Sequence, residues 1–212
     1  MWDNVEDESR VLTWMVEALR KDTALLVTDG LFDRKKAPRV SGAGWIFCCI
    51  RMQQMLRGSF FKISLSASTY RGKLLGLVVI HTLALAVIQF YKLDEALSKI
   101  CCDNIAALNQ SSWRRKRIKT GQKQANLLRC LCTIKTNQCM KFKYKHVDTH
   151  QNRIKLWHQL MLEEQINIKC DELAKSTVHR SIIGATSADR GHQLLPLEKA
   201  AVSWVARNQQ RM

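Results

Sequence analysis

Three aspartates stand where their carboxylates could act together. Asp29 follows a buried-strand pattern at 24–28, Asp103 follows another at 99–102, and Asp171 lies in a late helical pattern. Clustered carboxylates repel one another unless cations bind between them, and hard oxygen ligands favour Mg²⁺ or Mn²⁺. Two such ions about 3.5–4 Å apart activate a water and stabilise the leaving oxygen in phosphodiester hydrolysis. The three aspartates are therefore candidate metal ligands, although each alone is typical of a cap or a turn.

Basic residues dominate the charge of the chain. Lys and Arg exceed Asp and Glu by 34 − 18, a net charge of +16, which indicates an anionic partner such as nucleic acid, an acidic protein or anionic lipid. No acid occurs between Asp103 and Asp148, where eleven bases do. A solvated helix face usually mixes signs, so this stretch is interpreted as phosphate-contacting. The candidate nucleic-acid-binding residues are Arg114, Arg115, Lys116, Arg117, Lys119 and Lys123.

Hydrophobic periodicity predicts an α/β domain with a mixed sheet. The expected order is three strands, a helix, a strand, basic helices, a strand and a helix. The strands are expected at 24–28, 44–50, 59–65, 99–102 and 140–147, and the two long helices at 70–91 and 157–178. Residues 22–180 are expected to form the domain, with an acidic, helical N-terminal extension at 1–21 and a C-terminal extension at 181–212.

The cysteines and the apolar stretches bear on the cellular compartment. Eight cysteines occur without the CxxC spacing of a zinc site, and the acidic N-terminus has no apolar signal region. We therefore expect a reduced intracellular protein, cytoplasmic or nuclear and not secreted, without disulfides. The uncharged stretch 74–90 is at the lower edge of a membrane span, but it is interpreted as a buried core helix, with no membrane partner. The sequence does not predict an oligomeric state.

Six blocks in order resemble the type 1 ribonuclease H family, specifically the domains of retrotransposon and reverse-transcriptase polyproteins. They lie within 24–178 and read VTDG at 27–30, SGAGW at 41–45, STYRGKLLGL at 68–77, CDN at 102–104, HVDTHQ at 146–151 and CDELA at 170–174. The resemblance implies an RNase H-like fold, a five-stranded mixed sheet flanked by helices. It also implies two-metal endonucleolytic hydrolysis of the RNA strand of RNA/DNA hybrids, with Mg²⁺ or Mn²⁺.

The resemblance assigns roles to individual residues. Asp29 would bridge both metal ions, and Asp103 and Asp171 would be further ligands. His150 matches the mobile histidine that assists proton transfer or product release. A short segment at 194–202 resembles the continuation of such domains in some retroelement proteins, which suggests a piece of a longer polyprotein.

One position departs from the family pattern. The catalytic glutamate of a Tyr-Arg-Ala-Glu-Leu-like segment is replaced by Lys73, which removes a metal ligand and repels Mg²⁺. The Lys73 ammonium could instead neutralise Asp29 and Asp103, stabilising the fold while silencing the site. Gly72 also replaces a better helix former, at a cost of about 1 kcal/mol in an isolated helix.

Three hypotheses follow. The favoured one is an RNase H-like domain of a retroelement that still binds RNA/DNA hybrid, with hydrolysis lost or impaired by Lys73. An alternative is an active hybrid endoribonuclease that uses Asp29, Asp103 and Asp171. A further alternative is a non-enzymatic basic interaction protein, or a decayed remnant. A membrane anchor through 74–90 is least favoured.

Overall fold

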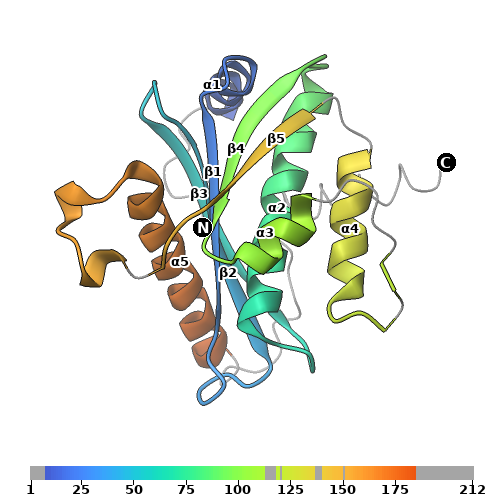
Figure 1. Ribbon diagram of the computed structural model, residues 1–212, viewed down its shortest axis with the longest axis vertical. Helices are drawn as coiled ribbons and strands as arrows, with labels where there is room; N and C mark the ends of the chain where they lie inside the picture. The colour runs from blue at the N-terminus through green and yellow to red at the C-terminus, as the bar shows by residue number, and fades with distance from the viewer. Residues whose placement is uncertain (1–7, 113–117, 120, 137–139, 150, 185–212) are drawn as a thin grey trace.

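A five-stranded mixed sheet forms the centre of the domain. The computed structural model describes residues 8–112, 118–119, 121–136, 140–149 and 151–184 (Figure 1). The strands are β1 (Ala24–Phe32), β2 (Val40–Cys49), β3 (Gln54–Ile63), β4 (Ala96–Cys102) and β5 (Met140–His146), in the order β3-β2-β1-β4-β5. The first three strands pair antiparallel, whereas β4 pairs parallel to β1 and β5 parallel to β4. The predicted mixed sheet is confirmed.

Helices cover both faces of this sheet. They are α1 (Glu8–Arg20), α2 (Thr69–Phe90), α3 (Ile105–Ser112), α4 (Ala125–Thr136) and α5 (Leu162–Gly184), with short 3-10 helices at Gln151–Arg153 and Trp157–Gln159. Figure 1 shows α5 on one face and α2, followed outward by α4, on the other. The sheet is therefore the middle layer of three.

The two faces of β1 explain why this strand is central. Leu25 and Val27 pack with Ile166 and Cys170 of α5 in one hydrophobic cluster. The alternate residue Leu26 packs in the other cluster, with residues of α2. Side chains of a strand alternate between its faces, so a strand covered on both sides needs a continuous apolar run. The sequence 24–27 supplies it.

The first strand extends further than the apolar run predicts. Its parallel pairing with β4 ends at Val27 and Cys101, but its antiparallel pairing with β2 continues to Phe32 and Ser41. Asp29 therefore lies inside β1, opposite Gly44, just beyond the point where the pairing with β4 ends. The expectation that the strand ends at residue 28 was wrong, because the antiparallel pairing with β2 continues past the polar Asp29 and past Gly30 to Phe32.

The long apolar helix is a core helix, as predicted. The backbone N–H of Arg71 donates to Ser68 Oγ at 3.1 Å and caps the N-terminus of α2. Among the described helices α2 is long and apolar enough to cross a membrane by length and composition, but most of it is buried inside the domain. The last helix begins at Leu162 rather than 157, because Trp157–Gln159 forms a separate 3-10 turn.

Candidate active site

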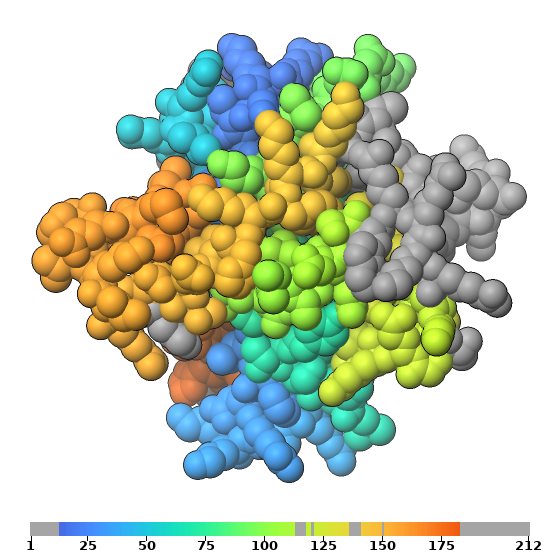
Figure 2. All heavy atoms as spheres, in the orientation of Figure 1, coloured from blue at the N-terminus to red at the C-terminus, as the bar shows by residue number. Residues whose placement is uncertain are grey.

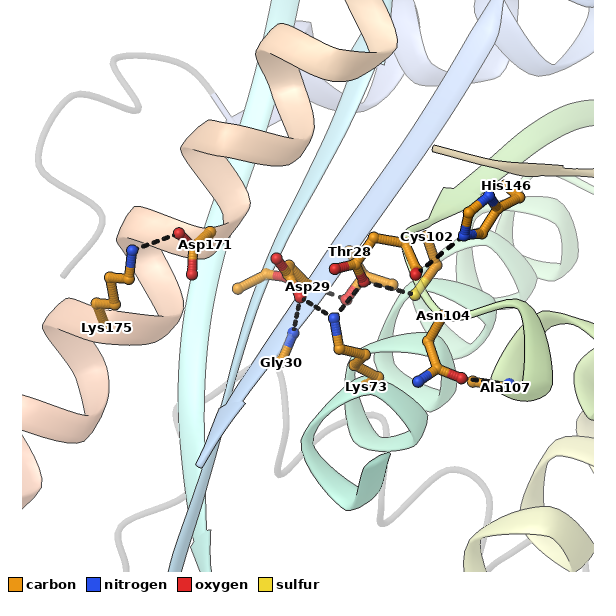
Figure 3. Close-up of polar contacts among 12 residues, drawn as sticks. Thr28, Asp29, Gly30, Lys73, Cys102, Asn104, Ala107, His146, Asp171 and Lys175 are labelled. Atoms are coloured by element: carbon orange, nitrogen blue, oxygen red, sulfur yellow. Dashed lines mark hydrogen bonds and ion pairs between the residues drawn. The ribbon is translucent and has the colours of Figure 1, made fainter. Parts of the chain in front are cut away.

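Asp29, Asp103 and Lys73 meet in one buried ion cluster toward the carboxyl ends of β1 and β4 (Figure 3). Asp103 directly follows β4, and Lys73 lies in the first turns of α2. Lys73 Nζ donates to Asp29 Oδ1 at 2.7 Å and also to Asp103 Oδ1. The side chains of Lys73 and Asp29 are each 8% exposed and that of Asp103 is 4% exposed. The predicted contact of Lys73 with both aspartates is confirmed.

Glycines bring α2 close enough to the sheet for this contact. A Cβ atom on Gly30 would lie 2.2 Å from Lys73 N, and one on Gly72 would lie 2.6 Å from the carbonyl oxygen of Gly42. One turn later, a Cβ on Gly76 would lie 1.9 Å from Thr28 Oγ1. Real Cβ atoms do not approach other heavy atoms so closely, so these positions exclude larger residues unless the helix moves. The backbone of Lys73 is thereby held against β1.

Burial and pairing set the ionisation of the cluster. Burial raises the pKa of Asp29 from 3.8 to about 6, with the charge of Lys73 and the N–H of Gly30, 2.6 Å from Oδ1, opposing the rise. Burial also disfavours the Lys73 ammonium, but the charges of Asp29 and Asp103 outweigh it and raise the pKa of Lys73. At neutral pH one ammonium therefore lies between two carboxylates.

Asp171 is not part of this cluster. It lies on α5 one residue after Cys170, whose Sγ donates to the carbonyl oxygen of Val27 at 3.4 Å. Its carboxylate instead accepts from Lys175 Nζ at 2.5 Å, one turn along the helix, and Figure 3 shows this pair on α5 apart from Lys73. Within the described residues, no hydrogen bond or ion pair joins Asp171 to Asp29 or Asp103.

The residues as arranged do not fit a divalent metal ion. The Lys73 ammonium occupies the place between Asp29 and Asp103 where an ion would have to bind. Among the residues that the structure describes, no group of three or more His, Cys, Asp or Glu side chains could hold a metal. The roles of Asp29, Asp103 and Asp171 as metal ligands stay predictions.

The other predicted site residues are only partly described. His150 and the run Arg114, Arg115, Lys116 and Arg117 lie outside the described residues. Lys119 and Lys123 are exposed on the segment that leads into α4. The next residue, Gln124, accepts through Oε1 from Arg71 Nη1 and donates through Nε2 to the Ser66 carbonyl oxygen at 3.2 Å. Lys123 therefore lies near the first turn of α2.

The lysines of β5 are neutralised within the domain. The ion pairs join Lys141 to Glu95 at 3.7 Å, Lys143 to Asp22 at 2.5 Å and Lys145 to Glu163 at 2.9 Å. These lysines belong to the acid-free stretch that predicted a phosphate-contacting surface. Because their acidic partners come from distant parts of the sequence, the stretch alone overstates the charge that is available to a partner.

One residue near the site was given no role by the sequence analysis, although it begins the block at 146–151. His146 ends β5 in register with Cys102, and its Nε2 lies 3.1 Å from the carbonyl oxygen of Asp103 (Figure 3). Its Nδ1 lies 3.8 Å from a carboxylate oxygen of Asp148. The alternating pattern of 140–147 marked this residue only as part of a strand. Its place at the end of a strand parallel to β4 was the available signal.

Comparisons with known proteins find similarity in structure alone. No family model and no curated protein matches the sequence. The protease-reverse transcriptase of prototype foamy virus is similar over 74% of this chain and 21% of its own, at a TM-score of 0.54 and 12% identity. LC11-RNase H1, solved in complex with an RNA/DNA hybrid, is similar over 75% of this chain and 99% of its own, at a TM-score of 0.53 and 13% identity. RNase H1 from the archaeon Halobacterium salinarum is similar over 74% of this chain and 98% of its own, at a TM-score of 0.50 and 13% identity. At identities this low, the structural similarity establishes a shared fold and nothing more.

Proposed function

We propose that this chain, which has the RNase H-like fold, binds RNA/DNA hybrid and hydrolyses its RNA strand weakly or not at all. The observation that carries the proposal is the contact of Lys73 Nζ with the carboxylates of both Asp29 and Asp103. The ammonium supplies the positive charge that two adjacent carboxylates need. It does not supply the Lewis acidity by which a divalent ion turns a bound water into a nucleophile.

The proposed partner follows from charge and fold together. The net charge of +16 exceeds what a soluble domain of this size needs, and Lys119 and Lys123 are exposed. LC11-RNase H1, which shares the fold, is solved with an RNA/DNA hybrid. A hybrid in the cytoplasm or nucleus is therefore the proposed ligand.

A retroelement origin is proposed on two observations. The six sequence blocks follow the order found in retrotransposon polyproteins, and a viral protease-reverse transcriptase is among the structural neighbours. Under this proposal the replacement at position 73 arose in a domain that once used Mg²⁺ or Mn²⁺.

Cleavage of a labelled RNA/DNA hybrid tests the catalytic part. The natural chain is compared with Lys73→Glu, and with Lys73→Glu combined with Asp29→Asn as the inactive control, in Mg²⁺ and in Mn²⁺. We expect little cleavage by the natural chain and a gain with Lys73→Glu that Asp29→Asn abolishes. Cleavage by the natural chain that disappears in the Asp29→Asn single variant would instead support an active enzyme that uses Asp29, Asp103 and Asp171.

Competition binding tests the partner. The hybrid is titrated against double-stranded DNA and double-stranded RNA of the same sequence, at several salt concentrations. Preference for the hybrid over both duplexes is expected, because a binding surface fitted to a hybrid recognises duplex shape as well as phosphate charge. Equal affinity for all three would support a basic interaction protein or a decayed remnant without a selected target.

A further inference from the structure

A second acid-free stretch of the sequence surrounds the turn between β1 and β2. No acidic residue occurs between Asp33 and Asp94, a longer interval than the one between Asp103 and Asp148. Four of its basic residues fall within the turn itself and are exposed, and together they are named the basic turn: Arg34, Lys35, Lys36 and Arg39.

The backbone of the basic turn is fixed by the acid that precedes it. Asp33 Oδ1 accepts from the backbone N–H groups of Lys35 and Lys36, each at 3.0 Å, and the Asp33 carbonyl oxygen accepts from Ala37 N at 2.8 Å. Ala37 is buried beneath the turn. The carboxylate of Asp33 is thus engaged by main-chain donors. The turn presents its basic side chains outward from a fixed frame.

The charges of the basic turn are not neutralised by the neighbours that the structure describes. In the part of the chain that the structure describes, none of its four side chains forms an ion pair, in contrast to the lysines of β5. A cluster of like charges with no internal partner destabilises a fold slightly and raises the local positive potential. Such a cluster is suited to an anionic partner.

A chain of contacts joins the basic turn to the predicted nucleic-acid residues. The carbonyl oxygen of Arg39 accepts from Ser64 N at 2.8 Å, two residues before the Ser66 carbonyl that accepts from Gln124. Gln124 directly follows Lys123. Figure 2 shows the blue turn at the lower end of this face, next to the teal residues that lead into α2 and the yellow-green residues around the start of α4. Both basic groups therefore lie at the same end of the domain.

We infer that the basic turn is a second phosphate-contacting surface, and that it binds the backbone of the same nucleic acid as Lys119 and Lys123. The inference rests on the proposed nucleic-acid binding. The two surfaces flank the first two turns of α2, which carry Lys73, so a duplex that lies over this end binds through its phosphates on both sides of the ion cluster. The partner is nucleic acid rather than anionic lipid, because this surface continues into the predicted nucleic-acid residues.

A matched pair of triple variants tests the inference. One variant carries Arg34→Gln, Lys35→Gln and Lys36→Gln. The control carries Arg20→Gln, Arg51→Gln and Arg57→Gln, which remove the same charge from exposed positions toward the other end of the sheet. Hybrid affinity is measured as a function of salt, because each phosphate contact adds about 0.9 to the slope of log K against log salt. Thermal unfolding identifies any variant that fails to fold.

The turn variant is expected to lose about 2–3 from the salt slope and at least tenfold in affinity at low salt, with little change in the control. A double variant Lys119→Gln and Lys123→Gln should lose a further, additive part. Unchanged binding by a folded turn variant would overturn the inference and leave the proposed function standing. An equal loss of hybrid affinity in the control variant would also overturn the inference. Binding to anionic lipid vesicles is measured in parallel, and a turn variant that loses vesicle binding but keeps hybrid binding would overturn it as well. Failure of the natural chain to bind any nucleic acid would refute the proposed function itself.

Discussion

At the scale of single residues, the ion cluster depends on one cation. Lys73 is buried between Asp29 and Asp103, and removing one partner of a buried ion pair typically costs 3–5 kcal/mol because the other charges stay buried. The resemblance to the ribonuclease H family predicted this contact, because it places Lys73 at the position of a glutamate that would share a metal site with both aspartates. The pairing of Asp171 with Lys175 was not predicted, although the spacing of four residues on a helix was a signal for it.

Divalent ions should stabilise only the variant that lacks the ammonium. In Lys73→Glu three carboxylates replace the mixed cluster, so the protein should be less stable in EDTA and should recover as Mg²⁺ or Mn²⁺ is added. A free ion concentration of 100 times the dissociation constant of one site adds about 2.7 kcal/mol to the free energy of unfolding. Thermal unfolding across an ion titration measures this. The natural chain should show no such dependence, and calorimetry that finds two tightly bound Mg²⁺ ions in it would contradict the explanation.

Two buried groups should give opposite pH dependences of stability. Burial lowers the pKa of His81 from 6.5 to about 4, so its stabilisation is present above pH 6.5 and is lost as the pH falls toward 4. The ring is fully buried, with Nδ1 2.6 Å from the Leu77 carbonyl oxygen and Nε2 2.9 Å from Tyr144 Oη. Asp29, with its pKa raised to about 6, favours folding below pH 3.8 and loses that contribution as the pH rises through 6.

In the natural chain these two contributions should largely cancel between pH 4 and 6. In Asp29→Asn the free energy of unfolding should rise with pH across this window, by about 1 kcal/mol per unit, because the contribution of His81 is no longer opposed by that of Asp29. In His81→Gln it should fall with pH. Urea unfolding at half-unit pH intervals measures both slopes. Parallel curves for the two variants would show that these groups do not control the dependence.

At the scale of elements, neighbouring strands decide where each element ends. The apolar run predicted the centre of β1, but its extension to Phe32 depends on pairing with β2, whose partner residues are distant in sequence. The strand β3 begins at Gln54, in a polar segment, because it pairs with β2 as the edge strand of the sheet. Edge strands need not be apolar on both faces, so periodicity could not locate this start.

The close contact between α2 and the sheet changes the interpretation of Gly72. As a helix residue it was expected to cost about 1 kcal/mol relative to alanine, but a Cβ at this position would lie 2.6 Å from the backbone oxygen of Gly42. Gly72→Ala should therefore destabilise the domain by about 1–3 kcal/mol despite its better helix propensity. Urea unfolding compares it with Gly121→Ala, where a Cβ meets nothing within 4 Å. A more stable Gly72→Ala variant would show that α2 can move away from the sheet at little cost.

At the scale of the whole molecule, the N-terminal helix shares the main core. The sequence predicted α1 from its apolar spacing but placed residues 1–21 in an extension. Trp14, Met15 and Leu19 of this helix are buried in the same cluster as Phe47 of β2, and the rings of Trp14 and Phe47 meet edge to face at 5.5 Å. A helical pattern shows which face is apolar but not which surface receives it, so packing of this kind is invisible to sequence reasoning.

This packing makes the boundary at residue 21 testable. If α1 is part of the cooperative unit, Leu19→Ala should cost about 2–5 kcal/mol, because Leu19 is fully buried and its truncation leaves a cavity. Arg20→Ala, at an exposed neighbour, should change little. A chain that starts at residue 22 should unfold at lower urea with a smaller m-value, because it buries less surface. Unchanged unfolding of both Leu19→Ala and the shortened chain would instead establish α1 as an appendage, and would place the domain boundary where the charge pattern put it.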